Sequence, residues 1–244
     1  MIVIALIICI GFAVQATAGF GAGLLVMSLG AHFWPISELM MFVASLSMML
    51  SLYICIRDFR HVEFRMLLRS ILPTMGLGVL VGLLVSSHIS PDVLRILLGV
   101  VVSAAAARGL YSLFSGKTVV AKRGGYFAYV WVVSAGVVHA LIVSGGPLLV
   151  YAIESMGLGK DGFRASLALV WFSFNSILVT HAVSTGTYGA ALFAHVASLV
   201  PALVIATLIG QALHSRVSEH VFRAVVFVLL AVAGVLLWLP QLLG

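Results

Sequence analysis

Charged residues are scarce in this chain: 244 residues include 13 Lys or Arg and 7 Asp or Glu, so 8% are charged and 63% are hydrophobic. In a soluble globular domain about a quarter of the residues are charged. The composition therefore excludes a water-soluble core and indicates a polytopic all-α membrane protein. The apolar runs are also continuous, and longer than the alternating segments of about ten residues that build a membrane β-barrel.

Other functional signals are missing as well. The two cysteines, Cys9 and Cys55, lie in apolar segments without metal-site or disulfide spacing, so they indicate small buried side chains. The sequence contains no His-Glu-x-x-His pair, G-x-S-x-G elbow or Walker loop. We therefore expect no enzyme activity, no metal site and no cofactor. No basic segment precedes Ile2-Val3-Ile4, so a cleaved signal peptide is not expected either.

The apolar residues form eight runs, and a single membrane crossing needs about 20 residues. The runs lie at approximately 2–30, 36–56, 70–87, 92–114, 126–157, 165–182, 188–209 and 220–239. The first and fifth are markedly longer than one crossing. Each contains a glycine-rich break, Phe20-Gly21-Ala22-Gly23 or Ser144-Gly145-Gly146-Pro147, and each break leads into Leu-Leu-Val.

The chain is an internal repeat of two membrane halves, residues 1–115 and 125–244. At an offset of 124, Gln15, Ala16 and Gly21 correspond to His139, Ala140 and Gly145. At an offset of 128 the later segments match, and the paired residues include Ser70/Ser198, Pro73/Pro201, Leu80/Leu208, Gly82/Gly210, Ser87/Ser215 and Arg95/Arg223. Matched breaks in two halves of a membrane protein indicate a transporter's substrate site.

The positive charges bear on how the two halves insert. The net charge is +6, but Lys and Arg lie between apolar runs, where they mark the cytoplasmic side of a bilayer and do not suggest nucleic acid. If all eight runs cross, as hydropathy alone suggests, Lys and Arg divide eight to five between the two sides. If runs one and five are re-entrant hairpins, the division is twelve to one. We therefore predict two inverted repeats, each a broken or re-entrant hairpin plus three transmembrane helices.

The two hairpin tips are expected to meet near the midplane and form an anion site. The second arms should begin at about Leu24 and Leu148, and a helix N-terminus offers free N–H groups and partial positive charge. The predicted backbone donors are Gly21, Ala22, Gly23, Ser144, Gly145 and Gly146, and Pro147 lies at a first helical position, where its missing N–H has no consequence. The alternative is that these glycines merely allow close helix packing.

Four polar side chains occupy matched positions in the two halves. Gln15 and His139 each precede the paired glycines by six residues, and Ser47 and Asn175 lie near the middles of runs two and six. Such groups either join helices or line a pocket. His139 could donate to an anion, carry a coupled proton or be a neutral packed histidine.

Residues near the run ends suggest boundaries of the membrane. Glu38, Glu154, Asp161 and Arg164 are expected as solvated or interfacial anchors. The four tryptophans, Trp34, Trp131, Trp171 and Trp238, fit an interfacial belt.

The stretch GGPLLVYAIESMGLGKDGFRASLALVWFSFNS at 145–176 resembles the sulfite exporter TauE/SafE-type family of small bacterial permeases. Three features carry the resemblance: the glycine-rich break that leads into Leu-Leu-Val, the motif Phe163-Arg164-Ala165-Ser166-Leu167, and the mid-helix Asn175. The first copy departs from the family, with Ala22 for an expected Gly and Met27-Ser28 where a Pro commonly follows. The resemblance covers essentially the whole chain and implies transport of sulfur oxyanions such as sulfite, sulfonates or thiosulfate, often as efflux.

These observations together predict a secondary transporter of a small sulfur-containing anion in the bacterial cell inner membrane. The expected partners are the anion, the lipid bilayer, a coupling proton and, where apolar surface is not covered by lipid, a second copy of the chain. A passive anion channel or uniporter and a non-transporting membrane assembly subunit are the alternatives.

Overall fold

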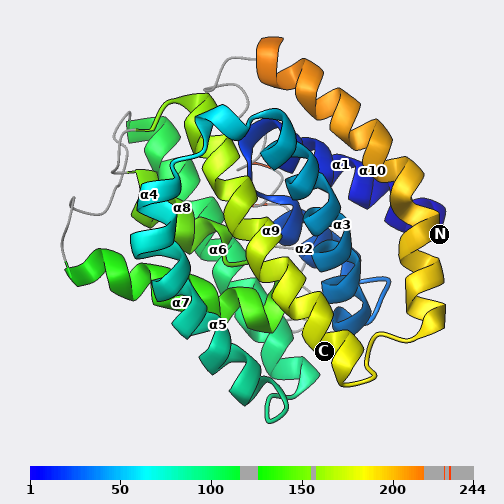
Figure 1. Ribbon diagram of the computed structural model, residues 1–244. Coiled ribbons are helices and arrows are strands. Elements are labelled where there is room, and N and C mark those ends of the chain that lie inside the picture. Colours follow the sequence, from blue (N-terminus) through cyan, green and yellow to red (C-terminus); the bar gives the residue numbers. More distant parts are fainter. Residues whose placement is uncertain (116–125, 155–157, 217–227, 229–230, 232–244) are drawn as a thin grey trace.

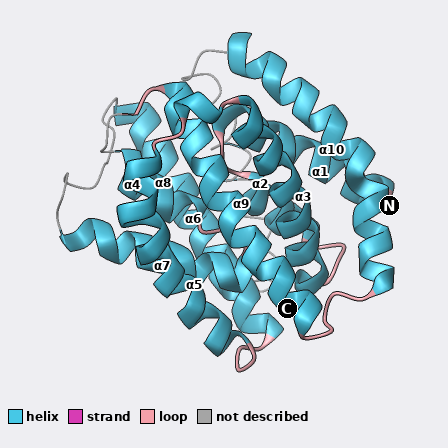
Figure 2. Cartoon of the chain, viewed as in Figure 1, coloured by secondary structure: helices cyan, strands magenta, loops and turns pink. Residues whose placement is uncertain are grey.

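The computed structural model describes residues 1–115, 126–154, 158–216, 228 and 231, and these residues form helices and connecting loops without a strand (Figures 1 and 2). The α-helices are α1 (Ile2–Ala18), α2 (Ala22–Gly30), α3 (Ile36–Arg57), α4 (Phe64–Met66), α5 (Leu72–Ser86), α6 (Pro91–Ser115), α7 (Tyr126–Ile142), α8 (Gly146–Glu154), α9 (Lys160–Ser184) and α10 (Ala190–Arg216). A 3₁₀ turn, η1 (Phe59–His61), and a π-helical turn, η2 (Leu67–Ile71), flank α4.

Five helical stretches of the described chain are long and apolar enough to cross a membrane: Ile36–Arg57, Phe64–Ser86, Pro91–Tyr111, Lys160–Ser184 and Ala190–Arg216. They coincide with five of the apolar runs, and the all-helical prediction is confirmed. The run at 220–239 lies outside the described residues apart from two positions. The total of eight segments, and the division into halves at 1–115 and 125–244, therefore stay predictions.

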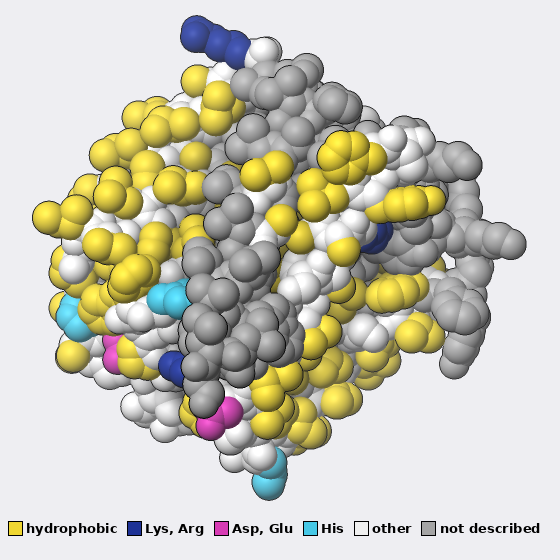
Figure 3. All heavy atoms as spheres, turned by 180° about the vertical axis from the view of Figure 1, so that it is seen from behind, with side chains coloured by type: hydrophobic (Ala, Val, Ile, Leu, Met, Phe, Trp, Pro, Cys, Tyr) yellow, Lys and Arg dark blue, Asp and Glu magenta, His cyan; other side chains and the backbone are white. Residues whose placement is uncertain are grey.

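The outer surface of the helices is apolar. Leu84 on α5 is 67% exposed and Leu208 on α10 is 64% exposed. Figure 3 shows hydrophobic side chains spread over much of one face of the molecule, with few charged groups among them. Exposed apolar surface on this scale is unfavourable in water and favourable in lipid, so the chain is a multi-pass membrane protein.

Both long apolar runs are broken at the glycine motifs. Helix α1 ends at Ala18 and α2 begins at Ala22, while α7 ends at Ile142 and α8 begins at Gly146. The second arms therefore begin two residues before the expected Leu24 and Leu148, and Pro147 is the second residue of its helix.

The two breaks share one backbone feature at their first residue, although Gly21 of the first break also has a left-handed φ of 111°. Gly19 (φ 86°) and Val143 (φ 51°) both lie in the left-handed region and are equivalent at the 124-residue offset. The N–H of Gly19 donates to the carbonyl of Gln15, and the N–H of Val143 donates to that of His139. A β-branched residue is strained in this conformation, by about 1–3 kcal/mol, whereas glycine is not.

Helix α2 folds back along α1. A Cβ placed on Gly11 of α1 would lie 2.7 Å from Cγ2 of Val26, and one on Gly30 would lie 3.5 Å from Cδ1 of Ile4. The start of α1 therefore packs on the end of α2 and the middle of α1 packs on the middle of α2, so the two helices form an antiparallel hairpin. Helix α8 likewise packs on α7.

The broken helices pack against helices of the opposite half. Helix α10 lies along α1 and α5 lies along α7, while α3 and α9 pack on each other (Figure 1). An ideal Cβ on Gly82 would lie 2.6 Å from the Cβ of Ala140, and one on Gly210 would lie 2.5 Å from the Cβ of Ala16. Because Gly82/Gly210 and Ala16/Ala140 are repeat equivalents, the two halves make the same close backbone contact.

We predict that Gly82→Ala and Gly210→Ala each lower the free energy of unfolding by about 1–3 kcal/mol, because the added methyl overfills a packed contact. Thermal unfolding in detergent provides the measurement. Gly76→Ala on the same α5 helix is the control, since its Cβ would meet its nearest neighbour at 3.8 Å. An equal loss at all three positions would mean that the helix contact is not the cause.

Candidate functional site

The two helix breaks meet inside the helical bundle. A Cβ placed on Gly23, in the first turn of α2, would lie 2.1 Å from the carbonyl oxygen of Val143. One placed on Gly146, the first residue of α8, would lie 3.7 Å from the Cβ of Phe20. The glycines therefore allow the two breaks to come into contact as well as allowing each chain to turn, because a side chain at Gly23 would collide with the backbone of the other break.

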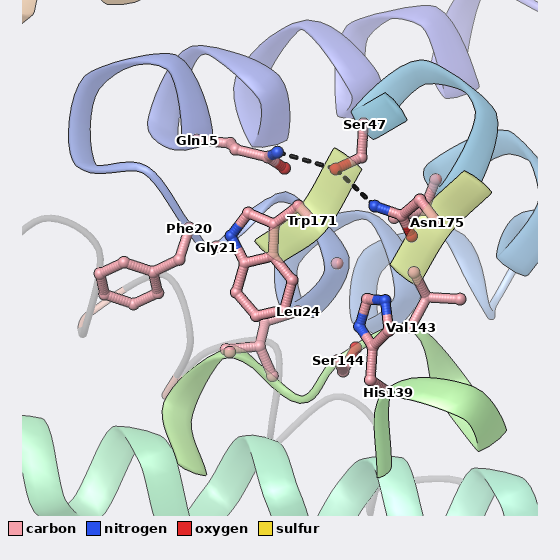
Figure 4. A pocket seen from close by; sticks show the side chains of 13 residues that line it. Gln15, Phe20, Gly21, Leu24, Ser47, His139, Val143, Ser144, Trp171 and Asn175 are labelled. Carbon is pink, nitrogen blue, oxygen red and sulfur yellow. Dashed lines mark hydrogen bonds between the residues drawn. The ribbon is translucent and has the colours of Figure 1, made fainter. Parts of the chain in front are cut away.

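A small cavity of about 20 Å³, large enough for about one water molecule, lies where the tips meet (Figure 4). The lining residues come from both breaks and from α1, α3, α7 and α9: Gln15, Phe20, Gly21, Gly23, Leu24, Val43, Ser47, His139, Val143, Ser144, Gly146, Trp171 and Asn175.

The cavity brings together most of the residues that the sequence suggested. Eight line it: Gln15, Gly21, Gly23, Ser47, His139, Ser144, Gly146 and Asn175. Three lie beside it without lining it. Ala22 is fully buried behind the first tip, Gly145 faces the carbonyl of Ala135, and Pro147 follows the first residue of α8.

Backbone N–H groups at the starts of α2 and α8 are available to the cavity. The first hydrogen bonds within these helices are donated by Leu25 to Gly21 and by Leu149 to Gly145. The N–H groups before them have no acceptor one turn earlier in the helix, which is the general situation at a helix N-terminus. Both helices have nine residues, enough to place partial positive charge at these ends.

Three polar side chains form a hydrogen-bonded chain at one wall of the cavity. The Gln15 amide donates to the Ser47 hydroxyl at 2.8 Å, and the Asn175 amide donates to the same oxygen at 3.1 Å (Figure 4). Ser47 thus accepts twice, which leaves its own proton to donate. The chain joins α1 and α3 of the first half to α9 of the second.

Two buried polar groups at the cavity lack a hydrogen-bond partner among the described residues. They are the side-chain oxygen of Asn175, which is 1% exposed, and both ring nitrogens of His139, which is 2% exposed. The His139 ring packs on Trp171, with centroids 5.2 Å apart. Since buried polar groups nearly always have partners, these atoms are candidates to bind a ligand.

The lining carries little fixed charge. Of the residues that line the cavity, His139 is the one with an acidic or basic side chain. The electrostatic character of the cavity therefore depends on helix ends, amides, hydroxyls and one imidazole.

The carbonyls at the end of α1 are satisfied by side chains from the second half. Arg164 donates to Ala16 at 2.9 Å and also pairs with Asp58, while the indole N–H of Trp171 donates to Gly19 at 2.8 Å. The Nδ1 of His214 lies 2.7 Å from the carbonyl oxygen of Thr17 and must donate to it, because a carbonyl only accepts.

Two sequence-based expectations are wrong here. Arg164 is 4% exposed and Trp171 is 5% exposed, so neither is a solvated or interfacial anchor. Both side chains are drawn inward because the broken end of α1 leaves carbonyls that need donors in a water-poor interior.

Five lining residues were not predicted: Phe20, Leu24, Val43, Val143 and Trp171. The repeat could have found two of them. Val43 and Trp171 are equivalent at the 128-residue offset, and each lies one helical turn before a predicted polar residue, so they share its helix face.

Known proteins match nearly the whole chain. The family model described as sulfite exporter TauE/SafE matches residues 3–237, a span that includes both breaks and every cavity residue. The chain is similar to the "Probable sulfite/organosulfonate exporter TauE" of Cupriavidus necator, with 26% identity over 233 residues, which cover 93% of this chain and 90% of the relative. No solved structure matches. The chain belongs to the sulfite exporter TauE/SafE family.

Proposed function

We propose that this protein is a secondary transporter that moves small sulfur-containing oxyanions, of the sulfite, sulfonate or thiosulfate class, across the bacterial cell inner membrane. One observation carries the proposal: a small cavity lies at two facing helix N-termini and contains buried polar atoms without partners. The name of the Cupriavidus necator relative, a sulfite/organosulfonate exporter, supports this substrate class.

The chemistry of the lining suits an anion with several oxygens. Backbone N–H groups near Gly23 and Gly146, the Ser47 hydroxyl and the His139 ring are donors on different sides of one cavity. A hydrogen bond to a charged oxygen contributes about 1.5–3 kcal/mol, so three or four bonds can offset much of the loss of hydration. A sulfite or sulfonate group presents three such oxygens to different donors.

The matched construction of the two halves supports inverted repeats that alternate access around this cavity. The two hairpins bring their tips to the cavity, and each packs on a helix of the other half through equivalent contacts at Gly82 and Gly210. If the halves exchange their conformations, the cavity opens to opposite sides of the membrane in turn. In this proposal the segments 2–30 and 126–157 re-enter the membrane and do not span it.

The direct test is counterflow in liposomes that contain the purified chain. Liposomes loaded with unlabelled sulfite, sulfoacetate or thiosulfate should accumulate the labelled anion from outside, because a carrier that returns loaded exchanges internal unlabelled anion for external labelled anion. A channel would equilibrate the label without transient accumulation. A folded sample that moves none of these anions would overturn the proposed substrate class and favour a non-transporting subunit.

We predict that Asn175→Asp raises the KM for the transported anion at least about tenfold at alkaline pH. Like charges about 4 Å apart repel by about 4 kcal/mol at an effective dielectric constant of about 20, and the new carboxylate would face the anion. The measurement is initial counterflow rate against external anion concentration.

Gln211→Glu is the matched control, because it makes the same amide-to-acid change on α10, where Gln211 bonds to Arg57 and Tyr53 outside the cavity. Its KM should equal that of the unchanged protein. An unchanged KM in folded Asn175→Asp would remove Asn175 from the anion site.

A further inference from the structure

The cavity is nearly symmetric in its construction but not in its chemistry. At the position where α7 presents His139, α1 presents Gln15, and both side chains line the cavity. The Gln15 amide is bonded to Ser47, whereas in the described part of the chain neither nitrogen of His139 makes a well-formed hydrogen bond and Asn175 is the polar side chain that interacts with the ring. One half therefore supplies a group that can gain a proton, and the other supplies an amide of similar reach that cannot.

Among the described residues that line the cavity, His139 is the one whose side chain exchanges a proton near neutral pH. Helices α1, α2, α5 and α7 contain no Asp, Glu, Lys, Arg or His apart from His139. The charged residues and histidines of the other long described helices lie toward helix ends: Glu38 and Arg57 on α3, Asp92, Arg95 and Arg108 on α6, Glu154 on α8, Lys160, Asp161 and His181 on α9, and His195, His214 and Arg216 on α10. Arg164 is engaged with Asp58 and the Ala16 carbonyl.

The physical chemistry of an apolar interior couples the proton to the anion. An unpaired anion in such a cavity is unfavourable, and so is an unpaired imidazolium. When both are present they neutralise each other, so each favours the binding of the other. Imidazole is the side chain that exchanges a proton with water near neutral pH.

We infer that His139 binds one proton together with the anion, so that a monovalent sulfonate and a proton move through the protein in the same direction. This inference rests on the proposed transport function. Water on the loading side gives a proton to the His139 ring as the anion enters, and the ring returns that proton to water on the other side as the anion leaves. The loaded cavity then holds one positive and one negative charge, and the empty cavity holds none. Neither form moves net charge across the membrane.

The test uses isethionate, a monovalent sulfonate that stays ionised near neutral pH and therefore cannot carry the proton itself. Liposomes containing the full chain would enclose a pH-sensitive dye, and labelled isethionate would report anion flux. We expect about one proton to accompany each isethionate that moves down its gradient. A potential set with potassium and valinomycin should leave the net flux unchanged.

His139→Gln places in the second half the side chain that Gln15 supplies in the first. We expect its anion flux to fall, its ratio of protons to isethionate to drop from about one to near zero, and its remaining flux to respond to the membrane potential. The matched control is His181→Gln, the same change at an exposed position of α9. It should keep the ratio of the unchanged protein. His139→Asn provides a second variant if the glutamine does not fit.

The outcomes separate this inference from the proposed function. Counterflow without proton movement, with a flux that depends on the potential, would overturn the role of His139 and leave the anion transporter standing. A ratio that stays near one in His139→Gln would overturn it too. Absence of exchange with isethionate, sulfite and thiosulfate alike would remove the proposed function and this inference together. The measurements on the unchanged protein decide the matter even if neither variant folds.

Discussion

The architecture depends on how this protein handles two interrupted helices in an apolar interior. A break leaves carbonyls at the end of one arm and N–H groups at the start of the next, and lipid supplies no partner for either. At the first break the carbonyls are satisfied by Arg164, Trp171 and His214, all from the second half of the chain. The N–H groups at the starts of α2 and α8 belong to a region where Gly23 and Gly146 line the cavity. The need to satisfy unpaired backbone groups thus connects the two halves by hydrogen bonds and leaves N–H groups that a ligand can use.

The two breaks share a left-handed residue at the end of the first arm, Gly19 or Val143, but different side chains support them. On α3, the positions equivalent to Arg164 and Trp171 hold Ile36 and Val43, whose side chains donate no hydrogen bonds. The second break also places Val143 in a conformation that the first assigns to Gly19. The first tip is therefore fastened to α9 by polar contacts, whereas the second holds a strained residue against Gly23. Together with the pair Gln15 and His139, this makes a duplicated scaffold chemically asymmetric at its centre.

Much of the arrangement around the cavity could be predicted because repetition restricts the possibilities. The glycine motifs, the matched polar positions near Gln15 and Ser47 and the excess length of two runs all follow from comparing the halves. Family membership followed from the motif around Arg164 and Asn175 and is confirmed by the match over residues 3–237. The orientation of the repeats and the number of membrane crossings depend on the bilayer and on the region beyond residue 216. Those two predictions therefore still rest on the distribution of Lys and Arg along the sequence.

The sequence by itself determined that the chain is helical and lipid-embedded, and where its helices break, because hydropathy and backbone freedom are local properties. Only the tertiary structure decided that Arg164 and Trp171 turn inward and that Val143 meets Gly23. It also decided that neither ring nitrogen of His139 makes a well-formed hydrogen bond within the described part of the chain. These outcomes depend on which backbone and side-chain groups of one half lie within hydrogen-bonding distance of the other half. The spacing of residues along the sequence does not specify those distances.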